Sequence, residues 1–105
     1  MLNKIQECFK KSRLYYSGHA RNEMELEELG EIHEDEVHEA ILSGEIIENY
    51  PDDVPYPSCL IFGRTSLSRP LHIVCAFSEE ENLAIVITAY EPDPTKWINL
   101  SRRRK

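Results

Sequence analysis

An arginine and a histidine stand inside apolar, strand-like runs in the second half of the chain. Arg64 ends the run SCLIFGR and His72 lies in LHIVCAF, and both residue types are costly to bury without partners. The linker between the runs is short enough for a hairpin that places Arg64 opposite His72. A permanent cation beside a group that titrates near neutrality is suited to handling phosphate esters. Alternatively, both side chains lie solvated and idle at an exposed strand end.

Four further polar side chains extend this candidate site. Thr88 and Tyr90 share one face of the last apolar run, LAIVITAY, where their hydroxyls would contact phosphate or ribose. The segment SGHAR places His19 and Arg21 in the first turn of an expected helix, where free N–H groups and positive potential attract phosphate. Each of these is also an ordinary residue for its position. The site therefore depends on whether the fold brings them together.

The elements that must position these residues follow from the hydrophobic periodicity. Helical spacing predicts three helices, over residues 2–16, 19–29 and 34–43. After Gly44 the pattern changes to β-branched and aromatic runs that predict four strands, at residues 45–50, 58–65, 71–78 and 83–90. The connections are too short for crossover helices. We therefore predict the α+β class, with N-terminal helices packed on one face of a four-stranded, mostly antiparallel sheet.

The register of the last two strands decides whether the site can form. If Ser78 pairs with Leu83 without a bulge, Thr88 and Tyr90 turn away from His72. A shift of one residue, or a bulge, sets His72 against Tyr90 instead. We expect this second arrangement, because it would join six apolar residues into one face against the helices: Leu83, Ile85, Ile87, Ile73, Cys75 and Phe77.

Length and composition limit the class of protein. A chain of 105 residues forms one domain, which we place at residues 1–98, followed by a basic tail at 99–105. We expect a cytoplasmic protein, because there is no apolar run for a membrane span or signal peptide. Three unclustered cysteines, Cys8, Cys59 and Cys75, indicate reduced core residues.

The net charge of −7 conceals a strong segregation. Residues 22–55 hold 13 of the 19 acidic residues and neither Lys nor Arg, so the rest of the chain is +6. The acidic block is either a solvated helical surface or a docking surface for a basic partner. We expect acidic and cationic residues to form separate faces, with a positive patch that includes Arg21 and Arg64.

Two metal or phosphate motifs are excluded. The segment IHEDEVHE suggests a zinc peptidase, but His33 and His38 are five residues apart and would point about 140° from each other on a helix. The four glycines are isolated and form no phosphate loop. We expect neither a metal nor a cofactor.

Five segments together resemble a known family: SGHARNEMELEELG, EDEVHEAILSGEIIENYP, PYPSCLIFGR, LHIVCAF and ITAYEPDPTKW. They are similar to a family of small bacterial proteins of unassigned function that is grouped with the RelE- and BrnT-like toxins of the barnase-related ribonuclease superfamily. The resemblance covers roughly residues 12–98. It implies helices on a curved antiparallel sheet, RNA on the open face of that sheet, and a co-encoded antitoxin that often binds zinc. The positions that match its polar signature are His19, Arg21, Arg64, His72, Thr88 and Tyr90.

The leading hypothesis is a toxin that acts as a metal-independent endoribonuclease. His19 or His72 would take the proton of a ribose 2′-hydroxyl, which then attacks the adjacent phosphorus, and the other histidine would protonate the leaving 5′ oxygen. Arg64, assisted by Arg21, would stabilise the charge on the phosphoryl oxygens.

The remaining candidates bind substrate. Thr88 and Tyr90 would position the RNA strand, and the tail residues Arg102, Arg103 and Arg104 would attract phosphates without regard to sequence. The tail is otherwise a solubilising end. Two rival hypotheses are a non-catalytic protein-binding module with the toxin fold and a metal-dependent nuclease that uses Glu48, Asp52 and Asp53.

Overall fold

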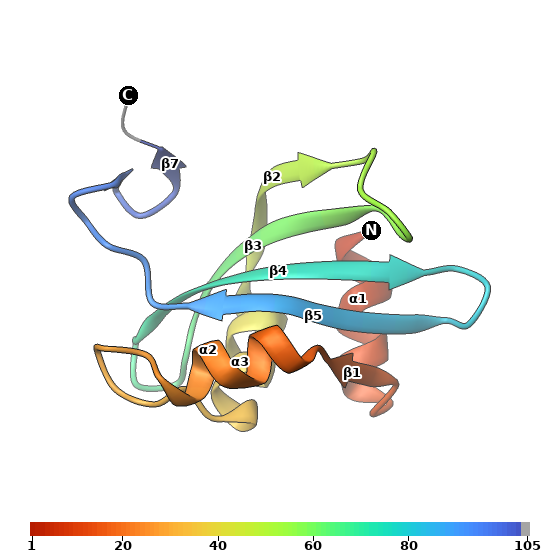
Figure 1. Ribbon diagram of the computed structural model, residues 1–105, viewed down its shortest axis with the longest axis horizontal. Helices are drawn as coiled ribbons and strands as arrows, with labels where there is room; N and C mark the ends of the chain where they lie inside the picture. The colour runs from red at the N-terminus through yellow and green to blue at the C-terminus, as the bar shows by residue number, and fades with distance from the viewer. Residues whose placement is uncertain (104–105) are drawn as a thin grey trace.

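The computed structural model describes residues 1–103 and has three helices and a five-stranded mixed sheet, an α+β arrangement (Figure 1). The helices are α1 (Leu2–Lys10), α2 (Gly18–Glu25) and α3 (Glu34–Ser43). The sheet contains β1 (Leu14–Tyr16), β2 (Glu45–Tyr50), β3 (Ser58–Arg64), β4 (Pro70–Ser78) and β5 (Leu83–Tyr90). Two short strands, β6 (Trp97–Ile98) and β7 (Arg102–Arg103), pair separately near the end of the chain.

The predicted four-stranded, mostly antiparallel sheet is wrong, because a fifth strand joins it in parallel. The strand order is β1-β5-β4-β3-β2, and β1 pairs with β5 in parallel register. Residues 14–16 were expected to continue the first helix. That helix ends at Lys10, where Ser12 adopts a left-handed conformation (φ 58°) and the Arg13 N–H donates to the Cys8 carbonyl. This is a Schellman-type ending, and it frees the next three residues to pair with β5.

The other helix ends follow the expected capping chemistry. Ser17 precedes α2, and its hydroxyl accepts a hydrogen bond from the Ala20 N–H at 3.0 Å. Glu36 in the first turn of α3 accepts from the His33 N–H at 3.0 Å, which forms a capping box. The observed bounds of α3 match the predicted helix at 34–43.

The hydrophobic core lies between the helices and one face of the sheet. The largest buried side chains come from α1, α3, β3, β4 and β5, and α2 adds Ala20 and Met24 to the core. Cys8, Cys59 and Cys75 are buried free thiols within this core, as predicted. At Gly63 a Cβ atom would lie 1.8 Å from the Ala40 carbonyl oxygen, so this glycine permits the close approach of α3 to β3.

A β-bulge sets which side chains of β5 face away from the helices. Ser78 pairs with Leu83, and the register shifts between Val74 and Cys75, so that His72 lies opposite Tyr90. The predicted facing of His72 and Tyr90 is therefore confirmed, but the predicted apolar face of β5 is wrong. Buried helix-facing residues on this strand are Ala84, Val86 and Ala89 instead of Leu83, Ile85 and Ile87.

The opposite face of the sheet, which we call the open face, is covered at one end by the C-terminal hairpin, residues 97–103. Trp97 on β6 is 4% exposed and packs on His72. Asn99 and Leu100 in the hairpin turn both have positive φ values. Among residues 1–103, no helix has the length and apolarity to span a bilayer.

Candidate functional site

Five ionisable or hydroxyl-bearing side chains gather where the C-terminal hairpin meets the open face. We call these residues the open-face cluster: Glu48, Tyr50, His72, Tyr90 and Arg103. Glu48 and Tyr50 are two residues apart on β2, so they share a face, and their partners on β3 are Leu60 and Ser58. His72 and Tyr90 are direct cross-strand partners, and Arg103 comes from β7. The cluster thus unites residues of β2, of the β4–β5 hairpin and of β7, strands whose arrangement Figure 1 shows.

His72 is fully buried and is held in one tautomer. Its Nε2 lies 2.5 Å from the carbonyl oxygen of Leu100, which can only accept, so Nε2 carries the proton. Nδ1 is then an acceptor for the Tyr90 hydroxyl at 3.2 Å. Burial lowers the pKa of His72, which keeps the imidazole neutral at physiological pH.

Aromatic rings surround His72 on the remaining sides. The centroid of its ring lies 4.4 Å from that of Trp97, 5.3 Å from Tyr90 and 5.6 Å from Phe62, and all three pairs meet edge to face. With both nitrogens bonded and no exposed surface, His72 cannot reach a phosphate in this structure. Its direct effect is to orient the hydroxyl of Tyr90.

Glu48 and Arg103 form the charged part of the cluster. The Arg103 guanidinium donates to both carboxylate oxygens of Glu48, at 2.9 and 3.3 Å, and the Tyr50 hydroxyl donates to the same carboxylate at 2.5 Å. Partial burial favours the neutral acid, but the hydrogen bonds outweigh it and the pKa of Glu48 is lowered. The carboxylate is therefore ionised at neutral pH. The side chain of Glu48 is 26% exposed and that of Arg103 61% exposed, so both can meet a ligand.

Tyr90 connects the neutral and charged parts of the cluster. Its ring is half-buried against His72, and burial raises its pKa to about 12. The charge of Arg103 opposes that shift. A phenolate formed at Tyr90 during a reaction would therefore have a cation nearby to stabilise it.

His19 lies on the outer side of β5, where it contacts a different group. It is 69% exposed, and its Nε2 lies 3.7 Å from the carboxylate of Glu23, one helical turn away on α2. Glu23 in turn accepts from the backbone N–H of Ala89, between Thr88 and Tyr90. His19 therefore reaches the edge of the open face. The described contacts of His72 do not include it.

Arg64 and Arg21 occupy other places than expected. Phe62 pairs with His72, whereas Arg64 pairs with Pro70, and the Arg64 guanidinium lies 5.5 Å from the Phe62 ring centroid. Arg64 is thus exposed at the border of the cluster. Arg21 is 2.8 Å from a carboxylate oxygen of Glu34, so a carboxylate already neutralises it.

The other predicted substrate-binding residues are divided. Thr88 is half-buried on the open face opposite Val74, and Arg102 is exposed on β7. Arg103 belongs to the cluster, and Arg104 lies outside the described residues. Of the predicted site residues, the structure therefore brings together His72, Tyr90 and Arg103, with Thr88 and Arg64 beside them.

Much of the acidic block has a structural role that neither sequence interpretation anticipated. Glu23 and Glu27 on and after α2 accept hydrogen bonds from the backbone N–H groups of Ala89 and Glu91. The guanidinium of Arg69 joins the carboxylates of Glu36 and Glu91 to the carbonyls of Gly30 and Glu31; these bonds involve all three guanidinium nitrogens. These carboxylates hold α2, the α2–α3 loop and the end of β5 together.

Sequence reasoning missed the roles of Tyr50 and Trp97 and treated Glu48 only as a metal ligand. The alternation in EIIENY places Glu48 and Tyr50 on one strand face, which was a usable signal. Trp97 is the single tryptophan of the chain, but its contact with His72 depends on a turn that no pattern predicts. Among residues 1–103 no group of three His, Cys, Asp or Glu side chains is arranged to hold a metal.

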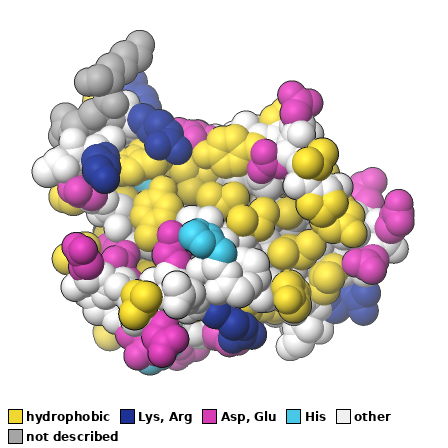
Figure 2. Space-filling model, in the orientation of Figure 1, with side chains coloured by type: hydrophobic (Ala, Val, Ile, Leu, Met, Phe, Trp, Pro, Cys, Tyr) yellow, Lys and Arg dark blue, Asp and Glu magenta, His cyan; other side chains and the backbone are white. Residues whose placement is uncertain are grey.

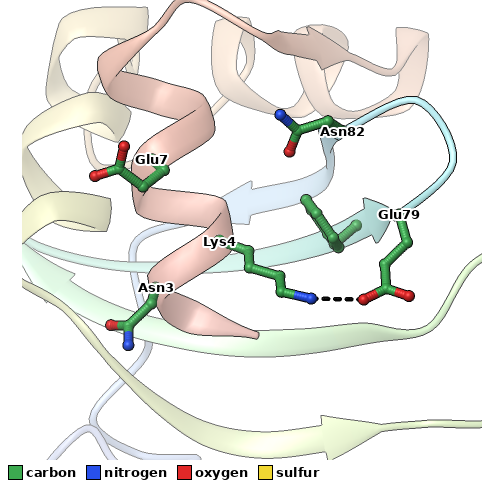
Figure 3. A pocket seen from close by; sticks show the side chains of 6 residues that line it. Asn3, Lys4, Glu7, Glu79 and Asn82 are labelled. Carbon is green, nitrogen blue, oxygen red and sulfur yellow. Dashed lines mark hydrogen bonds and ion pairs between the residues drawn. The ribbon is translucent and has the colours of Figure 1, made fainter.

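A separate hollow lies between α1 and the turn that joins β4 to β5 (Figure 3). Its main polar contact is the Lys4–Glu79 ion pair, in which both side chains are more than half exposed. Such an exposed pair contributes little to stability and is not arranged for catalysis. The open-face cluster is therefore the stronger candidate site.

Comparison with known proteins identifies the family of the domain but does not assign an activity to it. No curated protein and no solved structure matches the chain. The model of one family, described as a domain of unknown function (DUF4258), matches residues 16–91. That range contains α2, α3, β2 to β5 and four of the five cluster residues; of β1 it includes only Tyr16, and Arg103 lies beyond it. The chain thus belongs to the DUF4258 family.

Proposed function

We propose that this protein is a metal-independent endoribonuclease of the toxin class, with the open-face cluster as its active centre. The observation that carries the proposal is the meeting of an ionised carboxylate, a guanidinium and two tyrosine hydroxyls on the open face. These groups are what cleavage of RNA by its own 2′-hydroxyl requires: a proton acceptor, a cation for the phosphoryl oxygens and a proton donor. The resemblance to RelE- and BrnT-like toxins supports the same class.

Glu48 is the proposed general base. It takes the proton of the ribose 2′-hydroxyl, the 2′ oxygen forms a bond to phosphorus, and the bond from phosphorus to the 5′ oxygen breaks. Arg103 turns from Glu48 toward the phosphoryl oxygens as negative charge grows on them. The products are a 2′,3′-cyclic phosphate and a free 5′-hydroxyl; afterwards Glu48 loses its proton to water and the Tyr90 phenolate regains one from water.

Tyr90 is the proposed general acid. With a pKa of about 12 it holds its proton at neutral pH, yet it is a stronger acid than an aliphatic alcohol such as the leaving 5′-hydroxyl. Transfer from Tyr90 to the leaving 5′ oxygen is therefore favourable. His72 acts as a positioning residue: its buried Nδ1 accepts a hydrogen bond from the Tyr90 hydroxyl in the resting state, and this hydrogen bond breaks when the hydroxyl turns to give its single proton to the 5′ oxygen. This assignment replaces the two-histidine scheme, since His19 and His72 do not contact each other.

Surface charge limits how RNA approaches. Arg21 and Arg69 are paired with carboxylates elsewhere and Arg103 is paired with Glu48 inside the cluster, so the exposed arginines that flank the cluster are Arg64 and Arg102. Their location at the hairpin end provides a small basic region on a protein of net charge −7. RNA affinity is expected to fall steeply with added salt.

Cleavage of a labelled RNA by the purified chain in the presence of a chelator tests the proposal. Glu48→Gln and Tyr90→Phe should each reduce the cleavage rate by roughly a hundredfold or more, the range for removal of an acid–base group. Glu45→Gln, an exposed residue on the same strand, is the matched control and should cleave normally. A substrate with a 2′-deoxy sugar at the cleavage position should resist cleavage.

Two results would overturn the proposal. Loss of cleavage on addition of chelator would favour metal-dependent chemistry, and equal rates for Glu48→Gln and Glu45→Gln would remove Glu48 from the mechanism. An antitoxin partner remains a prediction from the resemblance. Growth arrest on expression, relieved by a co-expressed neighbouring gene product, would test it.

A non-catalytic protein-binding module is the second candidate, and a specific observation favours it. Apolar side chains occupy the part of the open face that the C-terminal hairpin leaves uncovered, over β4 and β5 (Figure 2). Exposed apolar patches of this kind mark association surfaces. Intact RNA after incubation with the wild-type chain, under all salt conditions, would place this function first.

A further inference from the structure

The uncovered part of the open face carries an apolar strip. Val74 and Ala76 on β4, Leu83 and Ile85 on β5 and Tyr15 on β1 all project to this face in the observed register. Tyr15 is 59% exposed, Val74, Leu83 and Ile85 are half-buried, and Ala76 between them is 3% exposed. We call these five residues the apolar strip. Burial of apolar side chains is favourable in free energy, so the strip is suited to pack against the surface of a partner.

The two ends of the strip carry opposite charges. The turn after Ser78 contains Glu79, Glu80 and Glu81. Glu79 is paired with Lys4, and the Arg13 guanidinium donates to the backbone carbonyls of Glu81 and Asn82, so Glu80 and Glu81 supply the negative charge for a partner. The other end, beside His72, carries exposed arginines at the hairpin and at the end of β3: Arg102, Arg103 and Arg64. His72 and Ser78 are six residues apart on β4, which separates the ends by about 20 Å. Figure 2 shows Lys and Arg side chains at the hairpin end, acidic side chains with a basic one beside them at the turn end, and hydrophobic ones between.

This arrangement is complementary to itself under a two-fold rotation. We propose that the occupant of the apolar strip is a second copy of this chain, in a symmetric dimer. Rotation about an axis through the middle of the strip places the strip against itself and the acidic turn of each copy over the basic end of the other. In such an interface the acidic turn and the basic end of each copy both meet groups of opposite charge. Closed two-fold dimers are also the commonest soluble oligomers.

The face is large enough for a stable dimer. The molecule measures 38 by 28 Å along its two longer axes, the plane seen in Figures 1 and 2. A stable interface buries roughly 800 Å² on each partner, which requires the strip and both charged ends to take part. The strip supplies the apolar centre of such an interface, and the charges supply its rim.

The dimer does not depend on the proposed ribonuclease activity. The dimer is detected by its molecular mass and the activity by RNA cleavage, so either proposal can be refuted while the other holds. If both hold, the acidic turn of one copy lies over the cluster of its partner, and RNA competes with dimer formation.

Sedimentation of the full-length chain across a range of concentrations tests the proposal. The mass should rise from that of the 12.2 kDa chain to twice that value. Ile85→Glu places a charge in the middle of the strip and should weaken association at least about tenfold. Leu42→Glu is the control, because Leu42 is 38% exposed on α3, which packs on the opposite face of the sheet, and should leave the dimer unchanged. Circular dichroism checks that both variants fold.

A charge exchange distinguishes this dimer from any other. Glu80→Lys alone and Arg102→Glu alone each set like charges together and should weaken self-association several-fold. A mixture of the two variants restores both opposite-charge contacts and should form a heterodimer as readily as the wild type. A wild-type chain that stays monomeric at all concentrations would overturn the proposal. So would a dimer that Ile85→Glu leaves intact, or a mixture that associates no better than either variant alone.

Discussion

Replacement of Arg69 by alanine should destabilise the fold more than any other change to a single surface-reaching charge. The guanidinium donates to the carboxylate of Glu91 at 2.7 Å, to that of Glu36 at 3.2 and 3.3 Å, and to the carbonyls of Gly30 and Glu31. Its side chain is 17% exposed, and those of Glu36 and Glu91 are 22% and 20% exposed. Removal of Arg69 leaves two largely buried carboxylates without their cation.

The magnitude follows from that burial. Breaking a fully buried ion pair by removal of one partner costs about 3–5 kcal/mol, and the residual solvent contact here reduces the expected loss to about 2–4 kcal/mol. For a domain of this size the loss corresponds to a decrease in Tm of roughly 10–30 °C. Arg69→Lys should fall between the wild type and alanine, because an ammonium cannot reach all the acceptors of the planar guanidinium at once.

Urea unfolding followed by circular dichroism measures the effect, with Arg64→Ala as the matched control. Arg64 is exposed, and its guanidinium donates to the Ser68 carbonyl, so its loss should cost about 0.5 kcal/mol or less. If Arg69→Ala lowers the free energy of unfolding by less than about 1 kcal/mol, the carboxylates do not depend on this cation and the proposed structural role of the acidic block is wrong.

Three other predictions concern stability. Because the pKa of His72 is lowered in the folded protein, the unfolded chain binds a proton at His72 at a higher pH than the folded chain does. The free energy of unfolding should therefore decrease as the pH falls below about 6.5, by up to about 1.4 kcal/mol per pH unit. In urea unfolding measured across this pH range, His72→Gln should remove the dependence. Gly63→Ala should cost more than about 3 kcal/mol in urea unfolding, because its Cβ meets the Ala40 carbonyl, whereas Gly18→Ala has open space and should be nearly neutral. Ser17→Ala should cost about 1–2 kcal/mol in thermal unfolding, because the hydroxyl caps α2 and donates to the Ile87 carbonyl; an unchanged Tm would contradict the capping role.

Local signals predicted the elements whose ends are marked in the sequence. Three acidic residues and Gly44 define α3, and β-branched runs between turn residues define β2 to β5. The parallel strand β1 was not predictable in the same way. Its three residues fit the period of the preceding helix, and only pairing with β5, about seventy residues later, makes them a strand.

The candidate site was predictable only in part, for physical reasons. The sequence limited the pairing of β4 with β5 to two registers, one of which sets His72 opposite Tyr90. The bulge that selects this register has no recognisable signal in LAIVITAY. Arg64 was placed two residues too close to His72 because the β3–β4 turn is tighter than assumed. The approach of Arg103 to Glu48 depends on tertiary docking of the C-terminal hairpin.

The bulge in β5 also bears on how sequences of this family should be aligned. One extra residue between Val86 and Thr88 sets the phase of everything that follows it on the strand. A relative that lacks this residue would exchange the faces of its equivalents of Ala89 and Tyr90, and a hydroxyl would then point into the core. A single gap at this point of an alignment would therefore separate relatives that carry the tyrosine on the open face from relatives that cannot, even where the surrounding residues are identical.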